Sequence, residues 1–513
     1  MTEKTAENTR QDKSRHLYEK LRQLKNSSVY PCHMPGHKRN MTNYPMREYY
    51  GLDITEIDGF DNLHNPQGIL KETMTRAGSL YGAETYLLVN GSTGGILSAV
   101  SAAVRRGDML LMARNSHRAA YHAIYLNDCK VKYIFPSFLE AYGICGDVSA
   151  QQVDKMLTEN PQVRAVLLTS PTYDGVVSDV KAIAACAHRR GIPVIVDAAH
   201  GAHFLLDGFP ASAVDCGADL VIHSIHKTLP ALTQTALVHV QGNLIDRERL
   251  RWLLTVYQTS SPSYLLLAGI EQCISILEEE GSALSRQFFE NNKLFEQNIQ
   301  NLKYLRVFGV NMRNTPAAER AWNMSCNREL FDFDVGKKVI SARGSGMSGQ
   351  ALYHKLLEKY GIQMEMAGQD YVTAIMTVMD RREGFLRLAD ALADIDSRMG
   401  AVSPVSCTDR AKRMNVPQTV FEIGAALEME RETKRLEDCE GEVAAQFIQI
   451  YPPGIPLIVP GERFTGEIID LLLEYRQQGF QIEGMREQAK KADVVRKEIY
   501  AQDENYLYDR AGM

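Results

Sequence analysis

The chain has 513 residues, of which 45% are hydrophobic and 23% are charged, a composition typical of a soluble globular protein with about two to four domains. Its 57 basic and 63 acidic residues give a formal charge of −6, which excludes the basic surface of a nucleic-acid-binding protein. The nine cysteines include no CxxC pair and are odd in number, so we expect reduced thiols, no complete disulfide framework and no metal site.

The N-terminal region predicts one helix followed by a long loop. Leu17, Leu21 and Leu24 recur at three- and four-residue steps, which predicts a helix over residues 14–25. A helix ahead of the first domain often packs on a neighbour, so we interpret residues 1–29 as a helical arm. Residues 30–68 are rich in Pro, Gly, His and Asn and predict an extended loop, whose length suggests a function.

No segment indicates export or membrane insertion. The first twenty residues are polar and lack the apolar stretch of a secretory signal. No apolar run reaches the length that spans a bilayer. We therefore expect a cytoplasmic protein that has neither a membrane nor a nucleic acid as its partner.

Between residues 83 and 240, short apolar runs alternate with helical stretches. The runs cover residues 85–89, 109–113, 131–135, 165–169, 194–196, 220–222 and 236–240. Fully apolar strands separated by helices indicate a mostly parallel sheet that is buried on both faces. Ligands of such sheets bind at the carboxyl ends of the strands, so residues just past these runs are candidates for a site.

Two further units are predicted downstream. Residues 266–294 predict a helix that connects domains, and the next unit is a smaller α/β domain with a strand over 330–335 and a helix over 349–360. The polar stretch 402–416 lacks periodicity and marks a boundary, beyond which an amphipathic helix is predicted around residues 467–478. The predicted domains after the arm are residues 30–300, 301–401 and 402–513.

A lysine and an aspartate follow two of the apolar runs. Lys227 lies in Ser224-Ile225-His226-Lys227-Thr228, where burial would lower its pKa and let its amine form a Schiff base with an aldehyde cofactor. Asp197 ends the run 194–196 and could pair with the protonated pyridine nitrogen of pyridoxal phosphate. Taken alone, Lys227 has about even odds of being an ordinary surface lysine, and Asp197 could be an ordinary helix cap. Their combination as Asp-x-x-His and Ser-x-His-Lys is far more specific.

Two other strand ends carry candidate cofactor ligands. The turn Asn90-Gly91-Ser92-Thr93-Gly94-Gly95 precedes a helix, where backbone amides and hydroxyls could hold a phosphate. It is not a nucleotide fingerprint, and alone it is a weak signal. His117 follows the run 109–113 and could stack on the pyridine ring, although an isolated histidine is more often structural.

In this order the motifs resemble a known family. They are HMPGHK at 33–38, NGSTGG at 90–95, RNSHR at 114–118, SPTYDG at 170–175, VDAAHGAH at 196–203, SIHKTLPALTQ at 224–234 and YPPGIPLIVPGE at 451–462. The set is similar to that of the bacterial ornithine/lysine/arginine decarboxylases. The length resembles the short members, which lack an N-terminal receiver-like wing. The resemblance implies an aspartate-aminotransferase-like large domain with a mostly parallel sheet, a smaller α/β domain and a C-terminal α+β domain.

The resemblance also implies roles for individual residues. Lys227 would hold pyridoxal 5'-phosphate, Asp197 would pair with its ring nitrogen and His117 would stack on the ring. The remaining cofactor contacts would come from Ser92, Thr93, Gly94, His200, Ser224 and His226, and from Ser260 and Ser261 of a second subunit. His226 is also a candidate proton donor. Ala198 departs from the acidic residue of many relatives, which we expect to alter packing without removing function.

Acidic residues are the candidates for binding a substrate cation. A guanidinium or ammonium group that enters a closed pocket needs acidic partners. Glu56, Asp58 and Asp61 follow HMPGHK, and Glu462 ends the C-terminal motif. The alternative for each is a turn cap or a structural ion pair, but as a set they predict at least one substrate contact.

These inferences predict an enzyme that decarboxylates a basic amino acid to a polyamine-pathway amine and CO2. Arginine is favoured over lysine or ornithine, because the planar guanidinium suits a bidentate carboxylate and the length resembles the short members. We expect a homodimer or higher homo-oligomer with shared active sites. The alternatives are another fold type I pyridoxal-phosphate enzyme, such as an aminotransferase, and a catalytically silent regulatory relative.

Overall fold

The computed structural model describes residues 16–40, 42, 44–139, 142–310, 330–399, 417–451 and 454–497. Its largest sheet has the strand order β1-β10-β9-β8-β6-β2-β3. The strands are β1 Glu84–Leu88, β2 Met109–Ala113, β3 Lys130–Ile134, β6 Val163–Thr169, β8 Val194–Asp197, β9 Leu220–His223 and β10 Ala236–Val240. Only β10 runs antiparallel to its neighbours, so the predicted mostly parallel sheet is confirmed.

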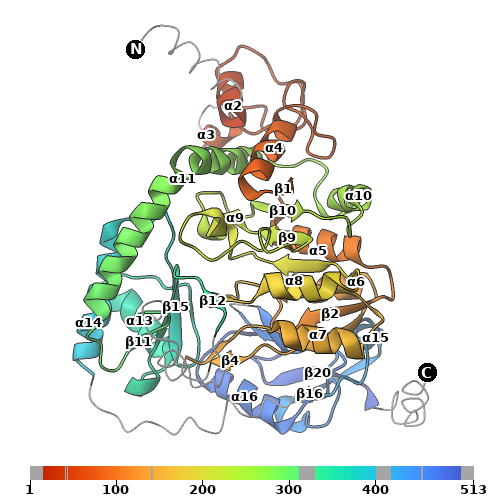
Figure 1. The fold of residues 1–513 in the computed structure, drawn as a ribbon, viewed down its shortest axis with the longest axis vertical. Helices are drawn as coiled ribbons and strands as arrows, with labels where there is room; N and C mark the ends of the chain where they lie inside the picture. The colour runs from red at the N-terminus through yellow and green to blue at the C-terminus, as the bar shows by residue number, and fades with distance from the viewer. Residues whose placement is uncertain are drawn as a thin grey trace.

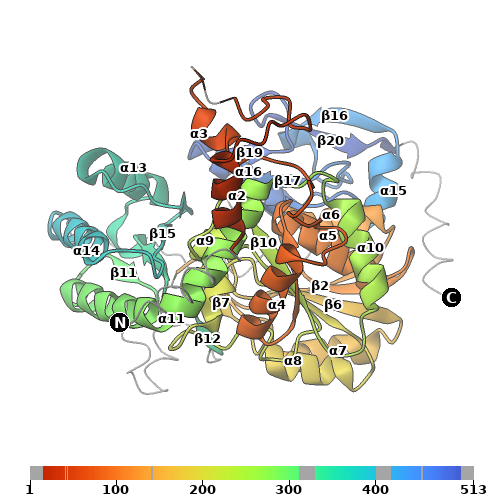
Figure 2. The same ribbon diagram turned by 90° about the horizontal axis from the view of Figure 1, so that it is seen from above.

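Both faces of the central strands are buried, as the apolar runs predict, whereas the edge strand β3 exposes Lys130 and Lys132. Along β2, Leu110 and Met112 belong to one apolar cluster, whereas Leu111 and Ala113 belong to another, because successive side chains of a strand point to opposite faces. Figure 2 shows α7 and α8 on one side of the strands and α5, α6 and α10 on the other. The helices are α5 Gly91–Ala103, α6 Arg118–Leu126, α7 Ala150–Glu159, α8 Val180–His188 and α10 Arg247–Tyr257.

The N-terminal helix packs on its own chain. Helix α2 Leu17–Lys25 buries Leu17 and Leu21 against α11 Tyr264–Ile299 of the same chain. The buried carboxylate of Glu271 on α11 binds His16, and it accepts a 2.8 Å hydrogen bond from Arg76 of α4 Ile69–Tyr81. The predicted loop over 30–68 contains one short helix, α3 Arg47–Tyr50. Residues 1–15, which include the start of the predicted helix, lie outside the described residues.

A second sheet belongs to the smaller domain. It has the order β11-β13-β15-β14 and is antiparallel throughout. Its strands are β11 Arg306–Val307, β13 Lys337–Ser341, β14 Met366–Ala367 and β15 Tyr371–Ile375, and its helices are α13 Gly349–Tyr360 and α14 Arg382–Ser397. Helix α13 lies where the sequence predicts it. In Figure 1 the 36-residue helix α11 runs from the large sheet to this domain and packs along α14.

The predicted strand over 330–335 is wrong in its extent. Only β12 Asp332–Phe333 forms, and it pairs with β7 Val176–Val177 of the large domain rather than with the small sheet. The chain turns at Asp334, whose carbonyl accepts a 3.1 Å hydrogen bond from the Lys337 amide. This turn interrupts the predicted strand, so β12 ends at Phe333. A short hairpin, β4 Phe138–Leu139 with β5 Ile144–Cys145, lies elsewhere in the large domain.

The C-terminal unit, whose ribbon is blue in Figure 1, has a hydrophobic core of its own. Its strands are β16 Arg431–Arg435, β17 Ile448–Ile450, β18 Ile455–Ile458, β19 Ile482–Glu483 and β20 Lys491–Val495, and its helices are α15 Ile423–Glu428 and α16 Gly466–Gln477. Helix α16 matches the predicted helix within one residue at each end. The predicted boundary at 402–416 lies outside the described residues. No helix in the described part of the chain has the length and apolar character needed to cross a membrane.

A buried ion pair joins the C-terminal unit to the large domain. Arg114, just past β2, donates a 3.0 Å hydrogen bond to the carboxylate of Glu462, and both side chains are less than 10% exposed. The same guanidinium donates to the Pro456 carbonyl at 2.7 Å, and Glu462 also accepts from the Val459 amide at 2.9 Å. Glu462 therefore has the structural ion pair that was the alternative to a substrate contact.

Breaking this pair should destabilise the protein. Replacing Glu462 with Gln leaves a buried guanidinium without its counter-ion, a loss that typically costs about 3–5 kcal/mol. We expect a clearly lower unfolding temperature in a thermal scan of the full chain. As a matched control, Glu487→Gln removes an exposed pair with Lys491 and should leave the unfolding temperature unchanged. Equal temperatures for wild type and Glu462→Gln would contradict this structural role.

Candidate active site

The predicted site residues gather at one edge of the large sheet. Asp197 ends β8, Lys227 lies in the short helix α9 Ile225–Thr228 after β9, and His117 begins α6 after β2. Strands β9, β8, β6 and β2 are adjacent and parallel, so their carboxyl ends meet at this edge.

Lys227 is largely withdrawn from solvent and lies against a histidine. Its Nζ lies 3.1 Å from Nε2 of His200, which follows β8. Burial lowers the pKa of the Lys227 amine, and the negative charges of Asp197 and Glu365 only oppose this effect. A lowered pKa increases the fraction of neutral amine, which is the form that attacks an aldehyde.

Asp197 is a buried carboxylate that lacks a close cation. It is 4% exposed, and it accepts a 3.2 Å hydrogen bond from the Ala199 amide. Burial raises its pKa, and the positive charge of Lys227 opposes that rise. No ion-pair partner for it lies within the described ranges of the chain. A buried carboxylate that has no cationic partner of its own favours binding of a cation such as a protonated ring nitrogen.

His117 has the properties of a stacking group. Its Nδ1 accepts a 3.2 Å hydrogen bond from the Ala119 amide, which fixes the ring as the cap of α6. Burial, together with the charges of Lys227 and Arg118, lowers the pKa of His117 to about 4. The ring is therefore neutral at physiological pH, and a neutral ring can stack on a flat cofactor without charge repulsion.

The start of α5 and the segment before α9 offer ligands for a phosphate. Asn90 does not cap α5 through its side chain, and Gly91 has a φ of 70°, a conformation that favours glycine. The hydroxyl of Ser224 is buried and has no hydrogen-bond partner in the part of the chain that the structure describes. Ser92 is half-buried, Thr93 is exposed and Gly94 is buried in the first turn of α5. These donors at a helix N-terminus fit a phosphate group.

His226 has one ring nitrogen committed to the backbone. Its Nδ1 lies 2.8 Å from the Thr235 carbonyl and therefore carries a proton that it donates. Burial lowers the pKa of the ring, so Nε2 bears no proton at neutral pH. A role as proton donor, which the sequence suggests, would require the ring to take up a second proton first.

The remaining predicted residues are exposed or make contacts of their own, except for one oxygen of Glu56. Ser260 and Ser261 are exposed, and the neighbouring Thr259 carbonyl accepts from His64 at 2.7 Å. Asp61 accepts hydrogen bonds from the Gly68 amide at 2.8 Å and the Leu70 amide at 3.0 Å, so it caps α4. Asp58 is exposed, and Oε1 of Glu56 is buried without a partner in the described chain.

Three residues that sequence reasoning missed complete the site. Nζ of Lys337, the first residue of β13, lies 2.7 Å from Nδ1 of His200. The Tyr173 ring meets His200 edge to face at 4.8 Å, and its hydroxyl donates to Glu365 of the smaller domain. The available signal was Lys337-Lys338 at the start of an apolar strand, because lysines are rarely buried without a partner.

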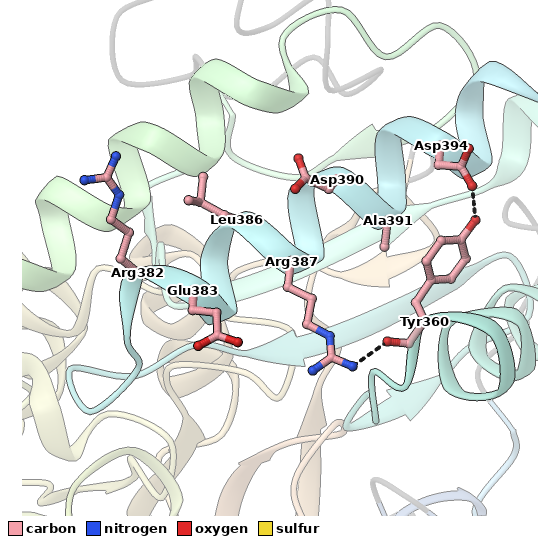
Figure 3. Close-up of a pocket in the computed structure, with 8 residues that line it drawn as sticks. All are labelled: Tyr360, Arg382, Glu383, Leu386, Arg387, Asp390, Ala391 and Asp394. Carbon is pink, nitrogen blue, oxygen red and sulfur yellow. Dashed lines mark hydrogen bonds between the residues drawn. The ribbon is translucent and has the colours of Figure 1, made fainter.

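These residues fit an aldehyde cofactor that carries a phosphate and a basic ring. Lys227 supplies a poised amine, Asp197 an unpaired buried carboxylate, His117 a neutral flat ring and Ser224 an unpartnered hydroxyl. The hollow in Figure 3 is separate from this site. It lies along α14, and Arg387 and Asp394 on that helix bind the Tyr360 backbone and side chain. None of the predicted site residues lines it.

Comparison with known proteins identifies the family. Residues 15–382 match the family described as Orn/Lys/Arg decarboxylase, major domain, and residues 409–496 match the corresponding C-terminal domain. The chain belongs to the Orn/Lys/Arg decarboxylase family. It is thus an amino-acid decarboxylase, and the resemblance inferred from the sequence is confirmed.

The decarboxylase aligns with named relatives along most of its length. It is 28% identical to arginine decarboxylase of Bacillus subtilis (strain 168) over 476 residues, which are 91% of this chain and 95% of the relative. It is 32% identical to the uncharacterized protein YaaO of the same strain over 467 residues, with 89% and 93% covered. Lysine decarboxylase A from Pseudomonas aeruginosa superposes with a TM-score of 0.80 at 20% identity, over 94% of this chain and 80% of that one. The superposition confirms the fold.

Replacing Asp197 with Asn should remove the charge that the site holds for a ring cation. The amide keeps the shape and can still accept from the Ala199 N–H, so the fold should survive. We expect decarboxylation to fall by about a hundredfold or more, because buried electrostatic groups in active sites typically contribute that much. The measurement is CO2 release under cofactor saturation.

The matched control for this change is Asp219→Asn. Asp219 is equally buried, and it accepts from the Val194 amide at 2.8 Å at the opposite end of the strands. We expect this variant to alter stability while cofactor-saturated turnover stays near that of wild type. Near-normal turnover of Asp197→Asn would show that the ring nitrogen is paired elsewhere.

Proposed function

We propose that this enzyme is a pyridoxal-phosphate-dependent decarboxylase of a basic amino acid, with arginine as the preferred substrate and the corresponding polyamine-pathway amine and CO2 as products. The observation that carries the proposal is the position of a half-buried lysine amine with a lowered pKa and a buried, unpaired aspartate at neighbouring strand ends. The family match supports the reaction class. Relatives named arginine decarboxylase that align over about nine-tenths of the chain support the choice of arginine.

The residues of the chain have separable tasks in this reaction. When bound, pyridoxal phosphate supplies an electron-withdrawing ring that accepts the electron pair left by CO2. Lys227 holds the cofactor through its amine and gives it up to the substrate. Asp197 keeps the ring nitrogen protonated, because an opposite charge nearby favours the charged form. His117 covers one face of the ring.

Orientation decides which bond of the substrate breaks. The start of α5, Ser224 and His226 would hold the phosphate end, while His117 and Asp197 would fix the tilt of the ring. By holding the group at both ends, these residues would fix which bond of the substrate is aligned for cleavage, which is a positioning effect. Transamination on the same fold would need a different alignment, so it remains the alternative that the product assay must test.

For the distal cation, we propose an acidic contact from the loop after HMPGHK. Of the four candidate acids, Asp61 is occupied as a helix cap, Glu462 is paired with Arg114 and Asp58 is exposed. Glu56 is the best placed to receive a ligand, since its buried Oε1 has no partner in the described residues. Neutralising it should raise KM for the basic substrate more than it weakens cofactor binding.

The direct test is an assay of products with a panel of amino acids. The full chain, reconstituted with pyridoxal phosphate, is incubated with arginine, lysine, ornithine and a neutral control, and amine, CO2 and keto acid are quantified. We expect amine and CO2 in equal amounts, fastest with arginine. Lys227→Ala should abolish turnover, and borohydride should fix the cofactor to the wild-type peptide that contains Lys227. Keto acid as the main product, or labelling at another lysine, would overturn the proposal.

We further propose a homodimer whose sites are shared between subunits. Thr259-Ser260-Ser261-Pro262 resembles a phosphate contact that the family supplies across a dimer, and both serines are exposed on this subunit. Lys227→Ala should be inactive, and so should Ser261→Asp, which repels a phosphate. In a dimer hybrid of the two, one site combines an intact Lys227 with an intact Ser261.

Random mixing of these two inactive proteins should therefore restore about a quarter of wild-type activity, because half of the dimers are hybrids and each has one intact site. The measurement is CO2 release after the subunits have been dissociated and reassociated together. Each variant treated alone serves as the control and should stay inactive. A fully active monomer at the assay concentration, or no recovery on mixing, would contradict sharing of the site.

A further inference from the structure

His200 lies between two lysines that come from different parts of the chain. Nζ of Lys337 is 2.7 Å from its Nδ1, and Nζ of Lys227 is 3.1 Å from its Nε2. All three side chains are largely or completely withdrawn from solvent. Neither the family match nor the sequence motifs assign a role to Lys337.

The local backbone is built to bring Lys337 to this position. The Asp334 amide donates to the Gly175 carbonyl at 2.8 Å, which ties the start of β13 to the SPTYDG loop. Gly175 has a φ of 94°, and a Cβ there would lie 2.7 Å from Cγ of Lys337. Only glycine at this position leaves room for the lysine stem, so the close packing of Lys337 is specific.

The chemistry of the three groups restricts where the protons lie. Burial and the two flanking lysines lower the pKa of His200 far below its ordinary value, so the ring is neutral. A neutral imidazole has one N–H donor and one acceptor nitrogen, whereas an ammonium group can only donate. If Lys337 is the charged lysine, its ammonium group donates a hydrogen bond to Nδ1 of His200. The ring proton then lies on Nε2, and Lys227 must accept a hydrogen bond from it as a neutral amine.

The charges around Lys337 favour this assignment. Burial raises the pKa of Asp334, but His203, which is hydrogen-bonded to it, and Lys337 together lower the pKa below its ordinary value, so Asp334 is ionised. Asp174, with a pKa raised by burial to about 6, and Glu365 add negative charge near Lys337. Burial, with Lys227 nearby, lowers the pKa of Lys337 only to about 8, so it is mostly charged at neutral pH.

The groups that face Lys227 act on its charge in opposite directions. Burial lowers the pKa of its amine, whereas Asp197, the carboxylate that the proposed function assigns to the cofactor ring nitrogen, and Glu365 raise it. His117 and His203 also face His200. The Tyr173 ring closes the remaining side of His200.

We propose that Lys337 is a positioning residue for Lys227. Its ammonium group donates to Nδ1 of His200, which fixes the imidazole proton on Nε2 and presents that N–H to the amine nitrogen of Lys227. Lys227 is thereby held as the neutral amine that can bond to an aldehyde. The inference deepens the proposed function and rests on it for the identity of the aldehyde, but the proton arrangement itself can be tested without turnover.

The first experiment reads the tautomer of His200 directly. The full chain is labelled with 15N-histidine, stripped of cofactor, and examined by long-range proton–nitrogen NMR, with His200→Gln used to assign the signals. We expect Nδ1 of His200 to be unprotonated and Nε2 to carry the proton between about pH 6 and 8. A proton on Nδ1 in this range would overturn the proposal, and no substitution at Lys337 is needed to obtain the answer.

The second experiment measures the Lys227 amine itself. The same cofactor-free chain is reacted with trace acetic anhydride across a pH series, and acetylation of the Lys227 peptide is quantified by mass spectrometry. Lys337→Met removes a cation and frees Nδ1, and both effects favour the charged form of Lys227. We expect the midpoint of the pH dependence of Lys227 acetylation to move about one unit to higher pH. At a pH below this midpoint, acetylation should then be about tenfold slower. Lys337→Arg should restore the wild-type midpoint.

The matched control is Lys338→Met. Lys338 is the next residue and is also buried, but its Nζ binds Asn292 and the Val335 carbonyl at 2.7 Å, away from His200. This variant should leave the Lys227 midpoint unchanged, while a general effect of losing a buried lysine would move it. An unchanged midpoint in folded Lys337→Met would overturn the proposal.

A double-mutant cycle separates the hydrogen-bonded route from simple charge repulsion. If Lys337 acts through His200, Lys337→Met should shift the midpoint less in the His200→Gln background than in wild type. Equal shifts in both backgrounds would show that the charge acts through space and would reject the role of His200. None of these outcomes depends on decarboxylation, so failure of the product assay and failure of this inference are distinguishable.

Discussion

Burial of ionisable groups at the carboxyl edge of a parallel sheet is the constraint on which the rest of the structure depends. Removing a charge from water is costly, so each group there must either lose its charge or meet a partner. Burial pushes the pKa of Asp197 up and those of Lys227, His117 and His200 down. The same physical cause thus produces a nucleophilic amine, a neutral stacking ring and a carboxylate suited to a bound cation.

Maintaining this environment requires all parts of the chain. The large sheet supplies the strand ends, the smaller domain contributes Lys337 and Glu365, and the C-terminal unit is fastened through Arg114, three residues before His117. Helix α11 links the first two, and it also receives the N-terminal helix through Glu271. The smaller domain therefore adds charged groups to the site, and the C-terminal unit is anchored next to it.

The fold alone does not choose the reaction. The chain superposes with a TM-score of 0.52 on ureidoglycine-glyoxylate aminotransferase from Bacillus subtilis, at 14% identity over 69% of this chain and 90% of that one, which shows a shared fold only. What distinguishes a decarboxylase must lie in the groups that orient the substrate around the cofactor. In this chain the smaller domain adds a second buried lysine, Lys337, and Glu365 to the surroundings of His200 and Lys227, and neither residue belongs to the large sheet.

The sequence by itself determined the features that depend on local pattern. Each of the seven strands of the large sheet lies within two residues of its predicted bounds, and the central strands are apolar runs because they are buried on both faces. Asp197 and Lys227 were predicted because polar residues directly after such runs must lie at the ligand-binding edge. The helices α13 and α16 follow from their periodicity in the same way.

Only the tertiary structure decided which distant groups meet. Lys337 and His200 are 137 residues apart, and Arg114 and Glu462 are 348 residues apart, so no local pattern records either contact. Tertiary packing also decided that the N-terminal helix lies against α11. The turn at Asp334 likewise decided how short β12 is. Periodicity reports which face of an element is buried, but not what it is buried against, because that depends on how the whole chain closes.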